Sequence, residues 1–69
     1  MEDFSMNETV RFLFKKMYKN EIEEINGTIS NEHIWELGYD GEELNPHTEN
    51  ILVLQEYLEM LEEKLSELN

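Results

Sequence analysis

A heptad pattern of apolar residues is the clearest feature of the chain. Near the C-terminal end, apolar residues recur at alternating three- and four-residue spacings: Ile51, Leu54, Leu58, Leu61, Leu65 and Leu68. This spacing places an apolar stripe along one side of a helix. Asn45 and Pro46 favour a helix start, because asparagine caps free amide groups and proline fits the first turn. The pattern therefore predicts a helix over residues 46–68.

A second helical pattern lies near the N-terminal end. Its apolar residues form one broad face at three- and four-residue spacing: Val10, Leu13, Phe14, Met17, Tyr18, Ile22 and Ile25. Ser5 and Glu8 have the spacing of a capping box, and Asn26–Gly27 is typical of a helix stop. These signals predict a helix over about residues 6–25. Phe12 falls on the opposite side of that helix and is not explained by the stripe.

The segment between the two helical patterns fits two structures. Ser30 or Asn31 could cap a short helix that ends at Gly38. Alternatively, the alternation over residues 33–40 could form a strand that turns at Asp40–Gly41. We favour the short helix or a turn, because an isolated β-hairpin is marginally stable and the residues after the turn make a poor returning strand.

These elements predict one all-α domain over residues 1–69. Two long helices, about 6–25 and 46–68, would form an antiparallel hairpin with the short helix or turn between them. A chain of 69 residues without cysteine has a small core and no disulfides. Phe12, Val53 and Tyr57 would stay uncovered in a single hairpin. We therefore expect a homodimer, in the form of a helical bundle.

The charge of the chain is strongly acidic and unevenly distributed. Seventeen Asp and Glu residues outnumber five Lys and Arg residues, for a formal net charge of −12. Four of the five bases lie close together: Arg11, Lys15, Lys16 and Lys19. In an antiparallel hairpin, the stripe of Arg11, Lys15 and Lys19, spaced four apart, could flank acids of the last helix such as Glu56, Glu59 or Glu63. The net charge argues against direct binding to nucleic acid and to anionic membranes.

The sequence shows no targeting or membrane-spanning signal. It begins with the acidic run Met1–Asp3, whereas a signal peptide begins with basic residues. The longest apolar run, Ile51–Leu54, is far shorter than the ~20 residues that cross a bilayer. Together with the lack of cysteine, these features predict a cytoplasmic protein.

Catalytic and metal-binding motifs are not apparent. The serines are explained by helix caps or surface positions, and no serine is set beside a base. His33 and His47 do not have the spacing of a known metal motif, although neighbouring carboxylates could in principle join them. We therefore expect a protein that is not an enzyme and that uses no cofactor or metal.

The remaining function classes are interaction and assembly. The leading hypothesis is a module that binds a basic protein through acidic and aromatic residues: Trp35, Tyr39, Glu56, Tyr57, Glu59 and Glu63. We expect Trp35 mainly to close the end of the hairpin as a core residue, with partner anchoring as the alternative. Two other functions remain open. One is an assembly protein that oligomerises through the heptad helix, and the other is a nucleic-acid-mimic inhibitor from a phage or mobile element.

Overall fold

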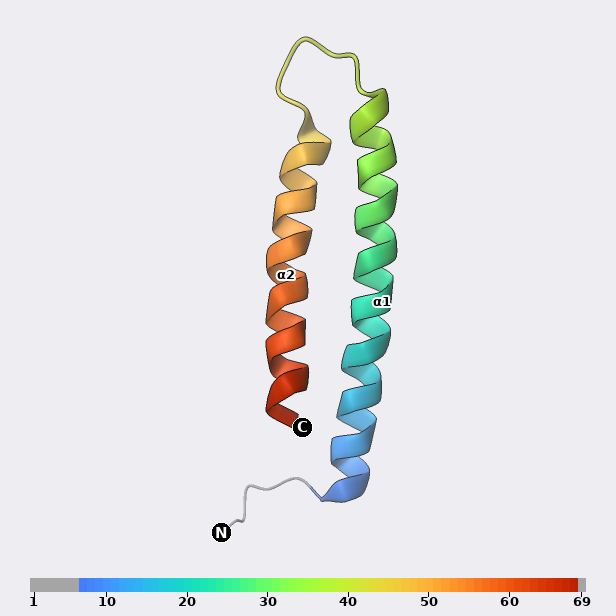
Figure 1. Cartoon of the computed structure of the whole chain (residues 1–69), viewed down its shortest axis with the longest axis vertical. Helices are drawn as coiled ribbons and strands as arrows, with labels where there is room; N and C mark the ends of the chain where they lie inside the picture. Colours follow the sequence, from blue (N-terminus) through green and yellow to red (C-terminus); the bar gives the residue numbers. More distant parts are fainter. Residues whose placement is uncertain (1–6, 69) are drawn as a thin grey trace.

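The protein is an antiparallel pair of long helices. The computed structural model describes residues 7–68. Helix α1 spans Glu8–Gly38 and helix α2 spans Pro46–Leu68, and the two pack along each other (Figure 1). This arrangement confirms the predicted helical hairpin. Residues 7–68 contain no strand, which excludes the β-hairpin alternative for the middle of the chain.

Helix α1 is longer than predicted. It passes through Asn26–Gly27 without a break and has 31 residues, so the predicted end near residue 25 and the separate short helix are both wrong. The physical reason is continued packing, because Ile25 is buried and Ile29 is half-buried. A glycine inside a helix costs about 1 kcal/mol, which such apolar contacts offset. The helix ends at Gly38, as predicted.

Asparagine side chains cap both helices. The Asn7 side chain accepts a hydrogen bond from the Val10 amide at 2.8 Å. The predicted capping box begins at Ser5, which lies outside the described residues. At α2, Asn45 Oδ1 accepts from the His47 amide at 3.0 Å, which confirms the predicted cap. Asn45 Nδ2 also donates to the Glu36 carbonyl oxygen at 3.0 Å, so this residue ties the end of α1 to the start of α2.

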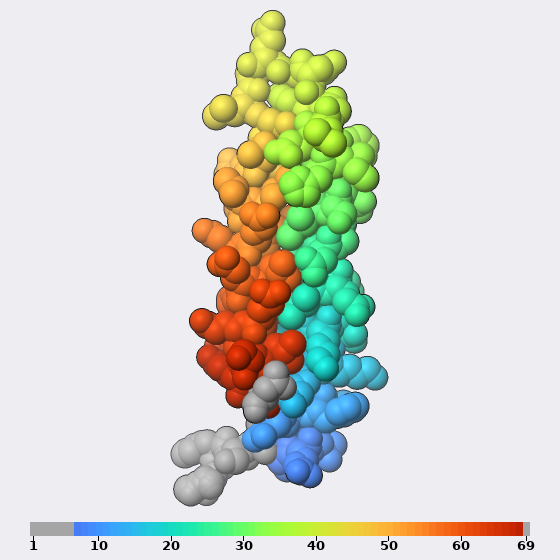
Figure 2. All heavy atoms as spheres, in the orientation of Figure 1, coloured from blue at the N-terminus to red at the C-terminus, as the bar shows by residue number. Residues whose placement is uncertain are grey.

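The core of the hairpin is a single narrow seam. Within residues 7–68, the buried hydrophobic residues are Ile25, Ile51 and Leu61, and the other heptad leucines of α2 are half-buried: Leu54, Leu58, Leu65 and Leu68. The predicted leucine seam therefore does face α1. The molecule is an elongated rod of 58 × 17 × 11 Å (Figure 2). Its radius of gyration is 16.6 Å, compared with about 11 Å for a compact domain of this length.

Replacing the glycine in the middle of α1 should stabilise the hairpin. Gly27 has a helical conformation and is exposed, and an added Cβ would meet no atom within 4 Å. We expect Gly27→Ala to raise the free energy of unfolding by about 1 kcal/mol, because alanine loses less backbone entropy. Urea unfolding followed by circular dichroism would measure the change. Gly38→Ala, at the last residue of α1, is the matched control and should gain less, so equal gains would contradict this explanation.

Candidate interaction surfaces

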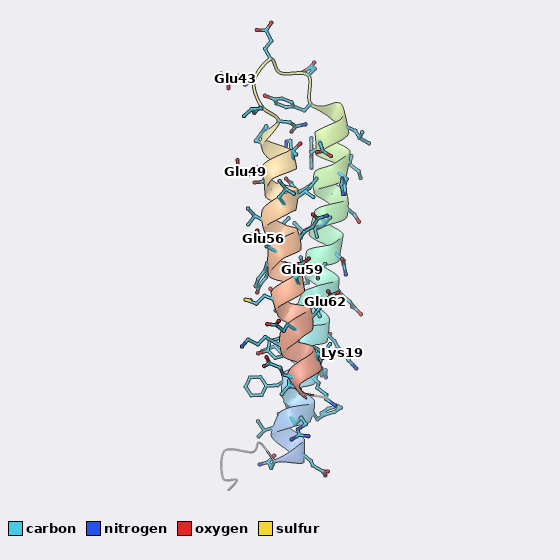
Figure 3. All side chains as sticks on the ribbon, turned by 60° about the vertical axis from the view of Figure 1, so that its left-hand side comes forward. Lys19, Glu43, Glu49, Glu56, Glu59 and Glu62 are labelled. Carbon is cyan, nitrogen blue, oxygen red and sulfur yellow. The ribbon has the colours of Figure 1, made fainter. Side chains whose placement is uncertain are left out.

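The outer side of α2 carries a ridge of carboxylates. This acidic ridge is defined by five exposed residues: Glu49, Glu56, Glu59, Glu62 and Glu63. Four of them are labelled in Figure 3 and follow α2 along its length. The predicted site residues Glu56, Glu59 and Glu63 therefore belong to one surface. Their separations of three, four and seven residues place them on neighbouring turns of the helix.

The basic residues of α1 leave this ridge largely uncompensated. Among the described residues, the ion pairs are formed by His33 and His47, and no lysine or arginine lies within ion-pair distance of a carboxylate. The expected pairing with Glu56, Glu59 or Glu63 is therefore absent. Lys19 instead lines a surface hollow together with Glu62 (Figure 3). The negative electrostatic potential of the ridge is therefore largely unneutralised and can act on other molecules.

One side of the hairpin is unusually apolar. We call it the apolar flank and define it by six exposed residues: Phe14, Met17, Trp35, Val53, Tyr57 and Met60. Phe14 and Trp35 lie on the same side of α1 because Phe14, Glu21, Thr28 and Trp35 are seven residues apart.

Contacts between the helices place residues of α2 on that side. The Tyr57 hydroxyl meets Glu21, and Thr28 shares a hollow with Val53. Met60 is seven residues after Val53, so it lies on the same side of α2. The flank therefore includes residues of both helices.

The opposite side of the hairpin is polar. Its two hollows are lined mostly by charged and polar residues: Lys15, Lys16, Lys19, Asn20, Glu23, Glu62 and Ser66, with Phe12, Ile22 and Leu65 between them. Phe12 is exposed there among lysines, which agrees with its predicted position away from the stripe. The two sides border opposite edges of the same seam, so they can be compared directly. Six of the twelve exposed large hydrophobic side chains among the described residues thus lie beside one edge of the interface, and the other six are spread over the rest of the surface.

Tyr57 joins the two helices within the apolar flank. Its hydroxyl donates a hydrogen bond to Glu21 Oε2 at 3.2 Å. Because this bond needs the protonated phenol, and the Glu21 charge disfavours a phenolate, the pKa of Tyr57 is raised above its ordinary value. The phenol ring lies beside Met17 and Leu61. Tyr57 therefore exposes part of its apolar ring, while its hydroxyl group already has a hydrogen-bond partner.

A polar cluster crosses the seam near the loop. The His47 ring donates from Nδ1 to Glu32 Oε1 at 3.0 Å, and Asn50 Nδ2 donates to the same oxygen at 2.8 Å. Thr48 Oγ1 donates to Glu36 Oε2. Glu32 and Glu36 continue the three- and four-residue spacing of Ile25 and Ile29, so carboxylates occupy the α1 side of the seam here.

The hydrogen bonds in this cluster lower the pKa of both glutamates. For Glu32, the bonds from His47 and then Asn50 stabilise the carboxylate, and for Glu36 the bond from Thr48 does so. A polar pair at such positions favours one register of the two helices, because slipping by one turn would separate the partners. Sequence reasoning missed this cluster, because it considered His47 only as a possible catalytic or metal-binding residue.

Trp35 and Tyr39 lie beside His47 at the loop end. The Trp35 ring stacks near the His47 ring at 6.4 Å between centroids, and Tyr39 approaches the same ring edge-on. Trp35 is nevertheless 63% exposed, so its predicted core role is wrong. No segment of the described loop covers it. Tyr39 is half-buried and lies over Gly41, where a Cβ would collide with its ring.

The Glu32 contacts should make stability depend on pH in acid. Its folded-state pKa lies below the ordinary value of 4.5, so its contribution is present above pH 4.5 and is lost as the pH falls through the lowered pKa. We expect Glu32→Gln to lower the urea midpoint at pH 7, and the difference from wild type to shrink well below pH 4.5. Relief of the net negative charge affects both proteins in the same interval, so the difference is the diagnostic quantity.

An exposed glutamate provides the control for that measurement. Glu59 belongs to the acidic ridge, and its carboxylate forms no hydrogen bond with any described residue. Glu59→Gln removes the same charge without breaking a contact, so its midpoint should stay near or above that of wild type at pH 7. If Glu32→Gln and Glu59→Gln behaved alike across the pH range, the hydrogen-bonded cluster would not stabilise the fold.

Residues 7–68 contain no group of three histidine or acidic side chains placed to hold a metal ion. In the same part of the chain, neither helix is long and apolar enough to cross a membrane. The same residues present an acidic ridge, an apolar flank and a polar cluster between the helices. No family model, curated protein or solved structure matches this chain.

Proposed function

We propose that this protein is a non-enzymatic interaction module that pairs with a second copy and offers its acidic ridge to a basic protein. The observation that carries the proposal is the apolar flank. Six large apolar side chains are exposed there, whereas the hairpin buries only Ile25, Ile51 and Leu61 among its described hydrophobic residues. A surface this apolar beside so small a core is typical of a protein–protein contact.

A second copy is the occupant that the flank favours. A chain of this size without disulfides usually gains stability from self-association, and two helical hairpins can share one four-helix core. A fully exposed aromatic side chain can bury about 150–250 Å², and those of the flank are 38% (Phe14), 63% (Trp35) and 36% (Tyr57) exposed. Phe14, Trp35 and Tyr57, with the three aliphatic residues, therefore expose several hundred square ångströms. That is the scale of the ~800 Å² that each partner contributes to a standard interface.

The acidic ridge supports the second half of the proposal. Glu56 and Glu63 are seven residues apart and lie away from the leucine seam, so pairing through the flank leaves them in solvent. Uncompensated carboxylates on a regular helix attract a complementary basic surface and speed its association at low salt. The role of the ridge is thus recognition of a basic partner rather than stabilisation of the fold.

Molar mass in solution tests the pairing. Light scattering across a concentration series at moderate salt should give twice the 8.3 kDa mass of one chain, with dissociation on dilution. A well-folded monomer at high micromolar concentration would overturn the proposal of self-association. Helix content from circular dichroism, recorded on the same samples, separates a folded monomer from an unfolded chain.

Binding of a lysine-rich helical peptide tests the ridge. Neutralising Glu56, Glu59 and Glu63 with glutamine should weaken peptide binding more than neutralising Asp40, Glu42 and Glu43 in the loop, although each variant removes three charges. Total charge is therefore matched, and only its location differs. Equal weakening by both variants would mean that the ridge is not a preferred binding surface.

A further inference from the structure

We propose that two hairpins pair through their apolar flanks in opposite directions, so that Trp35 of one copy packs against Phe14 and Met17 of the other. This inference rests on the proposed self-association and adds its geometry. It concerns the exposed rings at the two ends of the flank, which the hairpin itself leaves uncovered.

The layout of the flank is suited to a reversed pair. Phe14 and Trp35 lie near opposite ends of the same side of α1. The midpoint between them falls near residue 24, and the midpoint of the whole helix, Glu8–Gly38, falls at residue 23. A two-fold axis at this level therefore overlaps the full length of both α1 helices. It also brings each Trp35 opposite the other copy's Phe14, as an isologous contact requires.

Polar residues between Trp35 and Val53 interrupt the apolar flank, and this interruption also fits the reversed pair. Thr28 and Asn50 share a hollow with Val53, and Trp35 lies one heptad beyond Thr28 and is 63% exposed. In a reversed pair it meets the apolar end of the other flank instead. Tyr57 stays close to the axis, where its hydroxyl is already bonded to Glu21. The central contact thus buries no unsatisfied phenol group.

The charge of the two ends favours the reversed direction over the parallel one. Residues 32–49, at the loop end, contain six acidic residues and no lysine or arginine. Residues 8–19, at the other end, contain four basic residues and one acidic residue. The adjacent turns of α2 add Glu62, Glu63, Lys64 and Glu67, so that end is close to neutral.

Direction decides which of these ends meet. A parallel pair would set two strongly acidic ends side by side, and like charges repel. A reversed pair sets each acidic loop end beside a basic segment. The same reversal that matches Trp35 with Phe14 therefore also lowers the electrostatic cost.

Single-cysteine variants test the direction directly, because the natural chain has no cysteine. Met17, Glu24 and Asn31 are exposed and spaced seven residues apart, so they lie on one stripe that begins at Met17 of the flank. For a reversed pair centred near residue 24, Glu24→Cys should form a disulfide-linked dimer by itself. Met17→Cys and Asn31→Cys should each cross-link poorly alone and efficiently when mixed. Non-reducing gel electrophoresis after mild oxidation gives the yields.

The other outcomes separate the direction from the association itself. In a parallel pair, Met17→Cys and Asn31→Cys would each cross-link alone, and this result would overturn the reversed geometry while leaving the self-association intact. A monomeric mass by light scattering would remove both proposals. Asn20→Cys, on the polar side of the hairpin, is the control for random collision and should give little dimer. Circular dichroism of each reduced variant confirms that it folds.

Discussion

Leu61→Ala should remove much of the free energy of unfolding of the hairpin. Leu61 is 4% exposed, and it is one of the three buried hydrophobic residues described above. Truncating a buried leucine costs about 2–5 kcal/mol through lost transfer free energy and the cavity that remains. Natural domains have total stabilities of about 5–15 kcal/mol, and a two-helix chain with one narrow seam belongs at the low end. Urea unfolding followed by circular dichroism should therefore show a strongly reduced midpoint.

A leucine at the surface provides the matched control. Leu37 is 87% exposed, so Leu37→Ala removes the same atoms from a site that already contacts water. We expect a change of about 0.5 kcal/mol or less. Comparable losses for both variants would show that leucine content rather than the seam determines stability, and would contradict the packing described here.

The sequence predicted α2 better than α1 for a physical reason. The heptad positions of α2 from Ile51 onward are all isoleucine or leucine, so the repeat is visible without knowledge of the partner helix. In α1 the repeat continues through Glu32 and Glu36, whose partners are polar groups of α2. Only the packed structure shows that these carboxylates belong to the seam. Gly27 contributes to the wrong helix end near residue 25. Asn26–Gly27 is a local stop signal, and it does not include the tertiary contacts that continue the helix on both sides.

The candidate surfaces were predictable to different degrees. The acidic residues could be placed on one helix because their spacing is regular. Val53 and Tyr57 were recognised as left over from the seam, but Phe14 and Met17 were assigned to one broad inner face. A helix that packs against one partner covers a narrower stripe than that face, and the direction of the partner decides which edge remains exposed. The hydrogen bond between Tyr57 and Glu21 shows which edge of α1 remains exposed, and it joins residues that are far apart in the sequence.

Met60→Glu should convert a dimer into a monomer without unfolding the hairpin. Met60 is 46% exposed and lies on the apolar flank, so a second copy would cover its side chain. Placing an unpaired carboxylate in an apolar contact is costly, and each 1.4 kcal/mol weakens association tenfold. We expect the dissociation constant of the dimer to rise by about tenfold or more. Light scattering or sedimentation over a dilution series would measure it. Helix content should persist, because glutamate is a good helix former.

Leu52→Glu is the matched control: it adds the same negative charge to α2, but at a position outside the apolar flank. Leu52 is an exposed apolar residue of the same helix, it is not part of the apolar flank, and the substitution adds the same charge. General repulsion between two acidic chains would weaken association equally in both variants. A contact through the flank instead predicts a large effect for Met60→Glu and a small one for Leu52→Glu. If the order were reversed, the second copy would have to cover the opposite edge of α2, and the directional pairing inferred from Trp35 and Phe14 would fail with it.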